Sequence, residues 1–316
     1  MKVLVTGSGG FLGSFLCRRL EAKGHQIAKF TSKEIDLTSS SALDAFAGER
    51  FDQIYHLAAW TQAGDFCLHH PGEQWIINQK INTNVLSWWQ SHQAQAKIIC
   101  MGTSCSYAPD SDLIEDNYLA GTPIDSLFTY AMTKRMLHAG LLALYRQYNL
   151  RYLTLVPSTL YGPSYHTDDR QMHFIFDLIR KILRGKELGE PVVLWGDGSQ
   201  KREIIHVEDF ITIGLELADR VDNDIVNVGA GEEFTILHFA RKICEIVGFD
   251  PSRIEFDTSR YVGAKSKCLD TTKLRGLIED IPMVRLHDGL ESTIDWFRQN
   301  QSVFLRKKPW TRSLSE

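Results

Sequence analysis

The sequence lacks any long hydrophobic run, any closely spaced cysteine pair and any excess of positive charge. Residues 1–7 are apolar only briefly before a glycine, too short for a signal peptide or a membrane helix, so we expect a cytoplasmic protein with no membrane partner. A net charge of −4 gives no reason to expect a nucleic acid partner. None of the six cysteines forms a Cys-x-x-Cys pair, and we therefore expect reduced thiols and no metal site.

What the sequence does contain is a regular alternation of strand-like and helix-like segments in its first half. Apolar runs of strand length predict strands at residues 2–6, 27–30, 53–57, 97–101 and 152–156. Apolar residues at helical spacing predict helices at residues 11–23, 75–93 and 126–148, and Ser39 or Ser40 could cap a further helix through Phe46. Such alternation is typical of an α/β protein with a Rossmann-type, doubly wound parallel sheet covered by helices on both faces.

The alternation weakens after residue 157. A helix at 172–184, a strand at 192–195 and a final helix at 289–300 predict a smaller C-terminal substrate lobe, and residues 225–228 could return to the main sheet. We therefore expect one domain at residues 1–160 and a mainly substrate-binding lobe at 161–316, with segments around 200–230 returning to the first domain.

A glycine-rich segment, Gly7-Ser-Gly-Gly10-Phe-Leu-Gly13, follows the first predicted strand and opens the first predicted helix. Gly7 would allow a tight turn, Gly10 would let the backbone approach a pyrophosphate, and Gly13 would let the helix pack closely on the strand. The amino end of a helix favours the negative charge of a phosphate. This context predicts that the first domain binds NAD(P). The loop residues expected against the cofactor are Gly7, Gly9, Gly10, Phe11, Leu12 and Gly13.

The end of the second predicted strand indicates which dinucleotide is bound. It reads Lys29-Phe-Thr-Ser-Lys33, without the carboxylate that usually holds a ribose 2′-hydroxyl. Thr31, Ser32 and Lys33 could instead receive a 2′-phosphate, so we prefer NADP(H) and keep NAD(H) as an alternative. Asp36, followed by Leu37, lies where an aspartate often meets the adenine amine, although it could also cap a turn. Other strand ends expected at the cofactor are Leu57, Ala58, Ala59 and Pro157.

Tyr130 and Lys134 are the most informative pair in the sequence. A spacing of four on a predicted helix puts both side chains on one face. An ammonium beside a phenol favours the phenolate, so we expect Tyr130 to exchange a proton near neutral pH, with Lys134 tuning it and holding the cofactor. Thr103 follows the fourth predicted strand and should reach the same sheet edge. A glycine loop, a hydroxyl, a tyrosine and a lysine in this order predict an active site for hydride transfer.

With these residues in view, the chain resembles the extended short-chain dehydrogenase/reductase family of nucleotide-sugar enzymes over nearly its whole length. The segments that carry the resemblance are TGSGGFLG at 6–13, HLAA at 56–59, YAMTK at 130–134, LYGP at 160–163, KREIIHVEDF at 201–210 and NVGAG at 227–231. Within the family, MGTSCSY at 101–107 is similar to the branch that epimerises and reduces GDP-4-keto-6-deoxy-mannose. That branch has a cysteine where Cys105 stands and a histidine at the position of His173.

The resemblance implies NADP-dependent 3,5-epimerisation and 4-reduction of a GDP-4-keto-6-deoxy-hexose. A 4-keto group acidifies the hydrogens on carbons 3 and 5, and Cys105 as base with His173 as acid could remove and return a proton. Thr103 would hydrogen-bond the developing alkoxide. If Cys105 is instead a structural thiol and His173 a surface residue, a nucleotide-sugar 4-reductase or 4-epimerase remains. A cofactor-binding sensor without chemistry is a remote alternative.

The resemblance also implies contacts with a GDP-sugar and a dimer. The positions expected at the substrate, beside Thr103, are Ser104, Thr159, Lys181, Trp195, Arg202 and Lys267. Thr159 replaces a family asparagine, which leaves open a related GDP-heptose, and Gly9 replaces a family arginine, which weighs against NADP(H). The family pairs the helices at 75–93 and 126–148 across a two-fold axis, so we expect a homodimer.

Overall fold

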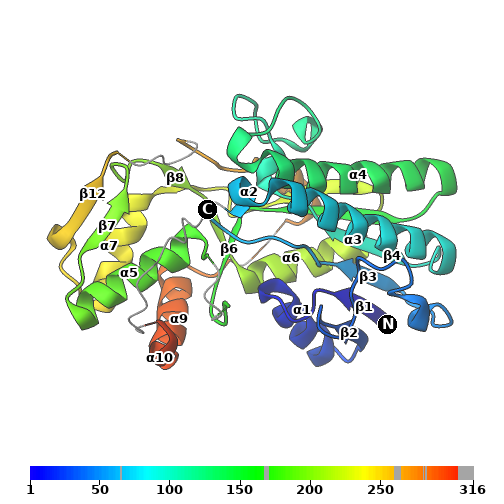
Figure 1. Ribbon diagram of the computed structural model, residues 1–316, viewed down its shortest axis with the longest axis horizontal. Helices are drawn as coiled ribbons and strands as arrows, with labels where there is room; N and C mark the ends of the chain where they lie inside the picture. Colours follow the sequence, from blue (N-terminus) through cyan, green and yellow to red (C-terminus); the bar gives the residue numbers. More distant parts are fainter. Residues whose placement is uncertain (65, 167–170, 260–264, 280, 282, 305–316) are drawn as a thin grey trace.

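The computed structural model describes residues 1–316 apart from 65, 167–170, 260–264, 280, 282 and 305–316. Its centre is a six-stranded parallel sheet in the order β10-β5-β4-β3-β1-β2 (Figure 1). The strands are β1 (Lys2–Thr6), β2 (Gln26–Phe30), β3 (Gln53–His56), β4 (Lys97–Met101), β5 (Tyr152–Pro157) and β10 (Asp224–Val228). From β1 the chain adds β2 on one side and β3 on the other, which creates a topological switch point beside β1. The predicted Rossmann-type sheet is confirmed.

Two pairs of helices cover this sheet because alternate residues of each strand point to opposite faces. Val3 and Val5 face the core beneath α1 (Phe11–Ala22) and α6 (Val207–Arg220). Leu4 faces the core beneath α3 (Pro71–His92) and α4 (Phe128–Tyr148). All three β1 side chains are fully buried, which explains the continuous apolar run of a strand buried on both faces.

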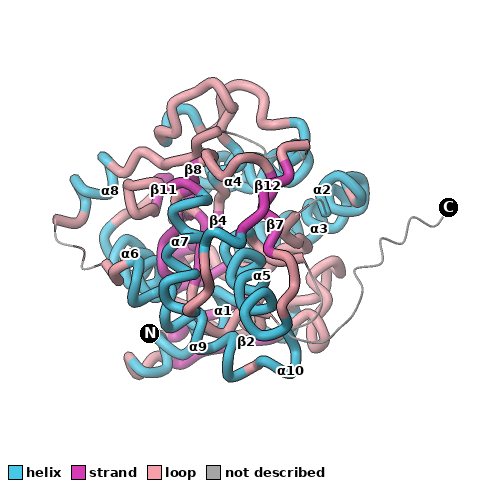
Figure 2. The backbone as a smooth tube through the Cα atoms, turned by 90° about the vertical axis from the view of Figure 1, so that its left-hand side faces the viewer, coloured by secondary structure: helices cyan, strands magenta, loops and turns pink. Residues whose placement is uncertain are grey.

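A second lobe with its own core lies beside the carboxyl edge of the sheet, in front in Figure 2. Phe176, Phe239 and Phe297 are among its buried side chains. Its main elements are α5 (Phe174–Leu188), β7 (Val192–Trp195), α7 (Ile236–Val247), β12 (Ile254–Asp257) and α9 (Leu286–Gln299). The strands that connect the lobes form two small pairs, β6 (Thr159–Tyr161) with β9 (Ile204–His206) and β8 (Lys201–Arg202) with β11 (Phe234–Thr235).

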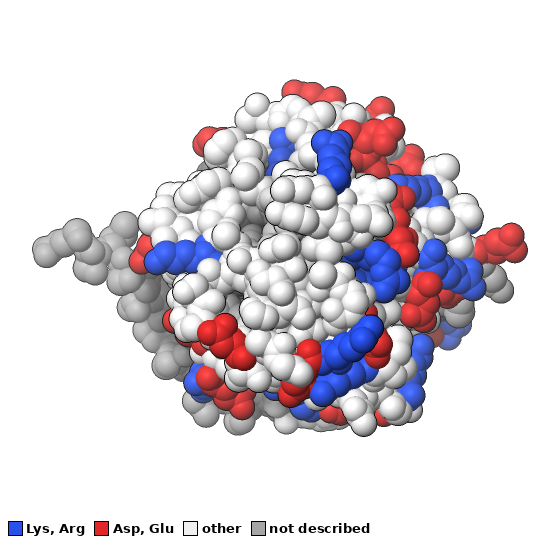
Figure 3. Space-filling view, turned by 90° about the vertical axis from the view of Figure 1, so that its right-hand side faces the viewer, with Lys and Arg blue, Asp and Glu red and all other residues white. Residues whose placement is uncertain are grey.

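Short elements complete the described chain. These are α2 (Phe66–His69), α8 (Thr272–Leu277), α10 (Gln301–Phe304) and the 3₁₀ turns Asp44–Phe46, Ser104–Ser106, Glu115–Asn117, Asp125–Leu127 and Pro251–Arg253. On the face seen in Figure 3, acidic and basic side chains are interspersed around a broad uncharged surface. No helix in the described part of the chain is long and apolar enough to cross a bilayer.

Most boundaries differ from the sequence prediction by a few residues, and three of the differences have a clear physical reason. The helix expected from Ser39 or Ser40 to Phe46 is only a 3₁₀ turn at its end, Asp44–Phe46, in a segment whose polar side chains bond locally and compete with a helix. The long helix expected at residue 75 begins at Pro71, because proline suits the first helical position. β5 extends one residue beyond the strand expected at 152–156: Pro157 pairs with Val228 in the register, and the Ser158 N–H donates to the Val228 carbonyl oxygen at 3.1 Å.

Candidate active site

The glycine loop forms the turn that the sequence predicted. Gly7 has a φ of +70°, and a Cβ there would lie 2.8 Å from the backbone nitrogen of Ala58. At Gly13 a Cβ would lie 2.2 Å from the Gly7 carbonyl oxygen, so both positions require glycine. Gly10 is the N-cap of α1, and no side chain caps that end of the helix. The first amides of α1 therefore suit a pyrophosphate.

The end of β2 contains a carboxylate that the sequence analysis did not assign. Glu34 folds back so that its Oε2 accepts hydrogen bonds from the Thr31 backbone N–H, at 2.7 Å, and from the Thr31 hydroxyl, at 2.9 Å. These bonds lower the pKa of Glu34, so it is charged at neutral pH. Ser32 and Lys33 are exposed beside it. The Asp36 carboxylate accepts bonds from the N–H and hydroxyl of Thr38, which is the turn-capping alternative.

Lys134 is buried near the carboxyl edge of the sheet. Burial lowers its pKa to about 8, and its charge interacts with His56 and Cys100. His56 bridges the hydroxyl of Thr6, at 2.9 Å, and Oδ1 of Asn82, at 3.1 Å. The segment HLAA at 56–59 gave no role to His56, because only the fold brings β1, β3 and α3 together around it.

Thr103 and Tyr130 interact through their side chains near Lys134. Thr103 is buried at the end of β4, its Oγ1 accepts the Cys105 N–H at 3.2 Å, and its own N–H donates to the hydroxyl of Tyr118. Burial and the nearby Cys105 thiol raise the pKa of Tyr130, and a side-chain hydrogen bond with Thr103 opposes the increase. The phenol is thus protonated at neutral pH. A phenol that can donate a proton fits the arrangement, and the effect of Lys134 on it stays a prediction.

Cys105 differs from the other cysteines of the chain. Burial by itself would raise its pKa, but the ammonium of Lys267, 3.0 Å from Sγ, outweighs burial together with a Thr103 hydrogen bond and the charge of Arg202. The result is a pKa below the usual thiol range. Burial instead raises the pKa of the other five, which are Cys17, Cys67, Cys100, Cys244 and Cys268. A reactive thiol therefore stands beside the Thr103–Tyr130 pair.

His173 occupies the N-cap of α5, at the start of the helix as predicted. The residue is exposed, and Tyr165 lies with its ring centroid 6.4 Å away. Desolvation lowers the pKa of His173, and the charges of His166 and Lys267 lower it further. Lys267 thus acts electrostatically on both His173 and Cys105, which places the three groups in one region of the protein.

The residues expected at the nucleotide end fall into two places. Lys181 lies 5.6 Å from the ring centroid of Trp195 and pairs with Asp177 at 3.1 Å. Trp195 is 55% exposed, with the Lys181 ammonium over its ring. Arg202 acts instead on Cys105 from β8, close to the reactive thiol.

Ser104 and Thr159 are the other two polar residues expected at the substrate. Ser104 belongs to the 3₁₀ turn after Thr103, and Thr159 begins β6. Between Pro157 and Thr159 stands Ser158, which is only 6% exposed and whose Oγ has no hydrogen-bond partner among the described residues. The sequence analysis missed this buried hydroxyl because its type alone carries no signal.

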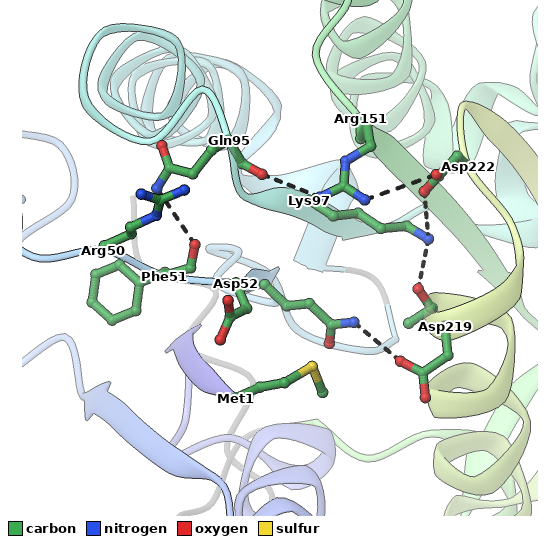
Figure 4. Close-up of a pocket in the computed structure, with 11 residues that line it drawn as sticks. Met1, Arg50, Phe51, Asp52, Gln95, Lys97, Arg151, Asp219 and Asp222 are labelled. Carbon is green, nitrogen blue, oxygen red and sulfur yellow. Dashed lines mark hydrogen bonds and ion pairs between the residues drawn. The ribbon is translucent and has the colours of Figure 1, made fainter.

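A separate cavity of about 340 Å³ lies at the opposite, amino-terminal edge of the sheet (Figure 4). Lys97 projects into it, donates to the carbonyl oxygens of Ala218, at 2.6 Å, and Val221, and pairs with Asp222 at 2.9 Å. These partners use all three donors of the ammonium, so it serves to anchor the end of α6 to β4. None of the predicted site residues lines this cavity, and we place the active site at the carboxyl edge. Within the described residues, no group of three or more potential metal ligands gathers.

A glycine loop at the switch point, with Thr103, Tyr130 and Lys134 at the same sheet edge, defines a nucleotide-dependent enzyme of the Rossmann class. Residues 3–229 match the NAD dependent epimerase/dehydratase family, and the chain belongs to that family. It is 33% identical to GDP-L-fucose synthase of Escherichia coli strain K12, with 96% of this chain and 98% of the relative covered.

Two solved structures share the fold. One is a GDP-L-fucose synthetase from Naegleria fowleri bound to NADP, with a TM-score of 0.84, 22% identity and 96% of each chain covered. The other is a GDP-6-OMe-4-keto-L-xylo-heptose reductase from C. jejuni, with a TM-score of 0.85, 20% identity and coverage of 95% of this chain and 98% of that one.

Proposed function

We propose that the protein is an NADP-dependent 3,5-epimerase and 4-reductase of a GDP-4-keto-6-deoxy-hexose that acts in the cytoplasm. One observation carries the proposal: a thiol with a lowered pKa, Cys105, stands beside the hydroxyl pair of Thr103 and Tyr130. A reductase needs only the hydroxyl pair, whereas an epimerase also needs a base of this kind. The similarity to GDP-L-fucose synthase of E. coli supports the same substrate class.

Apart from Glu34, the residues at the carboxyl edge fit NADP(H). The first amides of α1 would hold the pyrophosphate, Ser32 and Lys33, with Thr31 once its bonds to Glu34 are released, would meet the 2′-phosphate, and Lys134 would hold the nicotinamide ribose. The strand ends at residues 57–59 and Pro157 would line the same groove. When bound, the cofactor supplies the hydride for carbon 4. The NADP-bound state of the similar Naegleria structure supports this choice.

Epimerisation requires a proton to leave one face of the sugar and return to the other. Cys105 as thiolate removes the proton from carbon 3 or 5, which the 4-keto group acidifies. His173 returns a proton from the second lobe. Its lowered pKa keeps it neutral in the protein alone, and the negative charges of a nucleotide diphosphate would raise that pKa toward the range of an acid.

Reduction uses the hydroxyl pair. Tyr130 donates its proton to the carbonyl oxygen, consistent with its raised pKa, and Thr103 stabilises the developing alkoxide by a hydrogen bond. Lys134, with a pKa of about 8, remains mostly protonated at neutral pH and supplies positive charge beneath this centre. The chain therefore provides separate groups for the two half-reactions.

The second lobe would recognise the nucleotide and sugar. Trp195 and Lys181 offer a ring and a cation to the base and diphosphate, and Arg202 a fork of donors to the phosphates. Ser104 and Thr159 flank the sugar. Because Thr159 replaces a family asparagine, a GDP-heptose is the alternative substrate, and the similarity to the C. jejuni reductase supports it. We divide the chain accordingly, into a cofactor domain at 1–160 and a mainly substrate-binding lobe at 161–316.

The test uses GDP-4-keto-6-deoxy-mannose and NADPH in heavy water. Loss of NADPH absorbance together with deuterium at carbons 3 and 5, read by NMR, is the expected result. Loss of NADPH without deuterium would reduce the function to a 4-reductase. No reaction with this sugar but turnover of a GDP-4-keto-heptose would select the alternative substrate.

A further inference from the structure

A lysine from the second lobe contacts the reactive cysteine of the first. The ammonium Nζ of Lys267 donates to Sγ of Cys105 across 3.0 Å, although the two residues stand 162 positions apart in the chain. We propose that Lys267 is a positioning residue that holds Cys105 as a thiolate at neutral pH.

The contact has the geometry of a charge-assisted hydrogen bond. Each proton of an ammonium can donate to one acceptor, and a thiolate accepts far more strongly than a thiol, so the 3.0 Å contact favours the deprotonated sulfur. Thr103 adds a hydrogen bond and Arg202 a second positive charge. Both lysine and arginine act in the same direction, against the cost of burying the charge.

Two carboxylates fix the backbone on either side of Lys267. Glu233 accepts the Lys267 N–H at 3.1 Å, and the adjacent Ser266 donates its hydroxyl to both Glu233 oxygens at 2.7 and 2.8 Å. Two residues further on, the Leu269 N–H donates to Glu203 at 2.9 Å, and Glu203 is only 2% exposed. The segment that carries Lys267 is therefore held at two points, which fixes where the side chain of Lys267 starts relative to the sulfur.

Glu203 also holds a second loop. Its other oxygen accepts the Gly231 N–H at 2.8 Å, and a Cβ at Gly229 would lie 2.2 Å from that oxygen. A buried carboxylate thus joins the 229–231 loop to the segment after Lys267. The protonation of Cys105 therefore depends on correct docking of the second lobe. Neither lobe contains both the thiol and the lysine.

The catalytic role of Lys267 rests on the proposed epimerisation, in which the thiolate takes a proton from the sugar and becomes a thiol while Lys267 keeps its protons. The effect of Lys267 on the protonation of Cys105 does not rest on the epimerisation. The two ideas are therefore separable by experiment. If deuterium exchange is absent but Lys267 still controls the thiol, only the epimerase function fails.

The experiment measures alkylation of Cys105 by iodoacetamide between pH 5 and 10, followed on the Cys105 peptide by mass spectrometry. The full-length protein is compared with Lys267→Met, Lys267→Arg and Lys265→Met. Lys265 is exposed in the same segment, so its replacement removes an equal charge without touching the sulfur. Circular dichroism and thermal unfolding establish that each variant is folded.

We expect Lys267→Met to move the alkylation profile upward by at least about one pH unit, which lowers the rate at pH 7 by about two- to fivefold when the parent thiol is mostly ionised there. Lys267→Arg should keep most of the lowered pKa, and Lys265→Met should match the parent. Identical profiles for the parent and Lys267→Met would overturn the proposal. So would an equal upward shift in Lys265→Met, because that result would reflect general charge and not the contact. If Lys267→Met does not fold, a parent-like profile in Lys267→Arg supports the proposal, and an upward shift of a unit or more overturns it.

Discussion

The Glu34 carboxylate accepts two hydrogen bonds from Thr31 at the end of β2, from the backbone N–H at 2.7 Å and from the hydroxyl at 2.9 Å. This bond network puts a negative charge beside the residues proposed to receive the cofactor 2′-phosphate. It is the charge that the sequence pattern of that strand end had suggested was absent.

Replacing Glu34 by Gln should improve the use of NADPH. The amide keeps the acceptor oxygen for Thr31 but removes a charge that repels a 2′-phosphate. Because the group is exposed and screened, we expect only about a two- to fivefold rise in kcat/KM for NADPH at low salt, and little change for NADH. The ratio of the two kcat/KM values measures the effect. An unchanged ratio would mean that Glu34 does not face the phosphate.

Replacing Tyr130 by Phe should abolish most of the reduction. The ring still packs, but the proton donor to the carbonyl oxygen is lost, and a positioned donor is worth about two to four powers of ten. Turnover of NADPH should fall by this amount while cofactor binding, measured by fluorescence titration, stays near the parent value. Near-parent turnover would exclude Tyr130 as the donor.

Replacing Cys105 by Ser should separate the two half-reactions. A serine hydroxyl is not deprotonated near pH 7, so incorporation of deuterium at carbons 3 and 5 should fall at least about a hundredfold. Reduction of a substrate that needs no epimerisation should persist, since Tyr130 and Thr103 remain. Exchange at the parent rate would show that another group is the base.

Replacing Glu203 by Gln should change how stability depends on pH. Burial raises the pKa of Glu203 to about 7, above the 4.5 of an unperturbed glutamate. The folded state then binds a proton that the unfolded state lacks between pH 4.5 and 7, so this group's contribution is greatest below pH 4.5 and is lost as the pH rises to 7. The loss amounts to about 3 kcal/mol.

In the Glu203→Gln variant that part of the pH dependence should disappear. Urea unfolding of both proteins at pH 5 and pH 7.5 gives the difference. Parent and variant with the same dependence on pH would rule out Glu203 as its source.

A negative charge on α3 should disrupt the proposed homodimer. Ile76 is 55% exposed on α3, and Phe128 and Met136 are exposed on α4, the two helices expected at the two-fold axis. Ile76→Glu should shift the mass in solution toward the monomer, measured by light scattering at micromolar concentration. Leu188→Glu is the control, because Leu188 is 41% exposed on α5 in the other lobe. A parent protein that is already monomeric would contradict the dimer itself.

Local features of the fold were predictable because they depend on neighbours in the chain. The strand at residues 97–101 is found at its predicted bounds, and β1, the glycine loop and α1 follow each other within a few residues. The helix expected before Phe46 was wrong, because hydrogen bonds among nearby polar side chains compete with a helix there. Spacing along one helix placed Tyr130 and Lys134, but it could not give the pKa of the phenol, which burial controls.

By itself, the sequence determined most strands and helices of the sheet, the cofactor loop and the residue types at its carboxyl edge, since strand and helix periodicity are short-range patterns. Only the tertiary structure decided which charges meet. It brought Lys267 to Cys105 and Glu34 back to Thr31, and it buried Glu203 between two loops. Protonation depends on burial and on charges within a few ångströms, and neither quantity can be read from the order of residues in a chain.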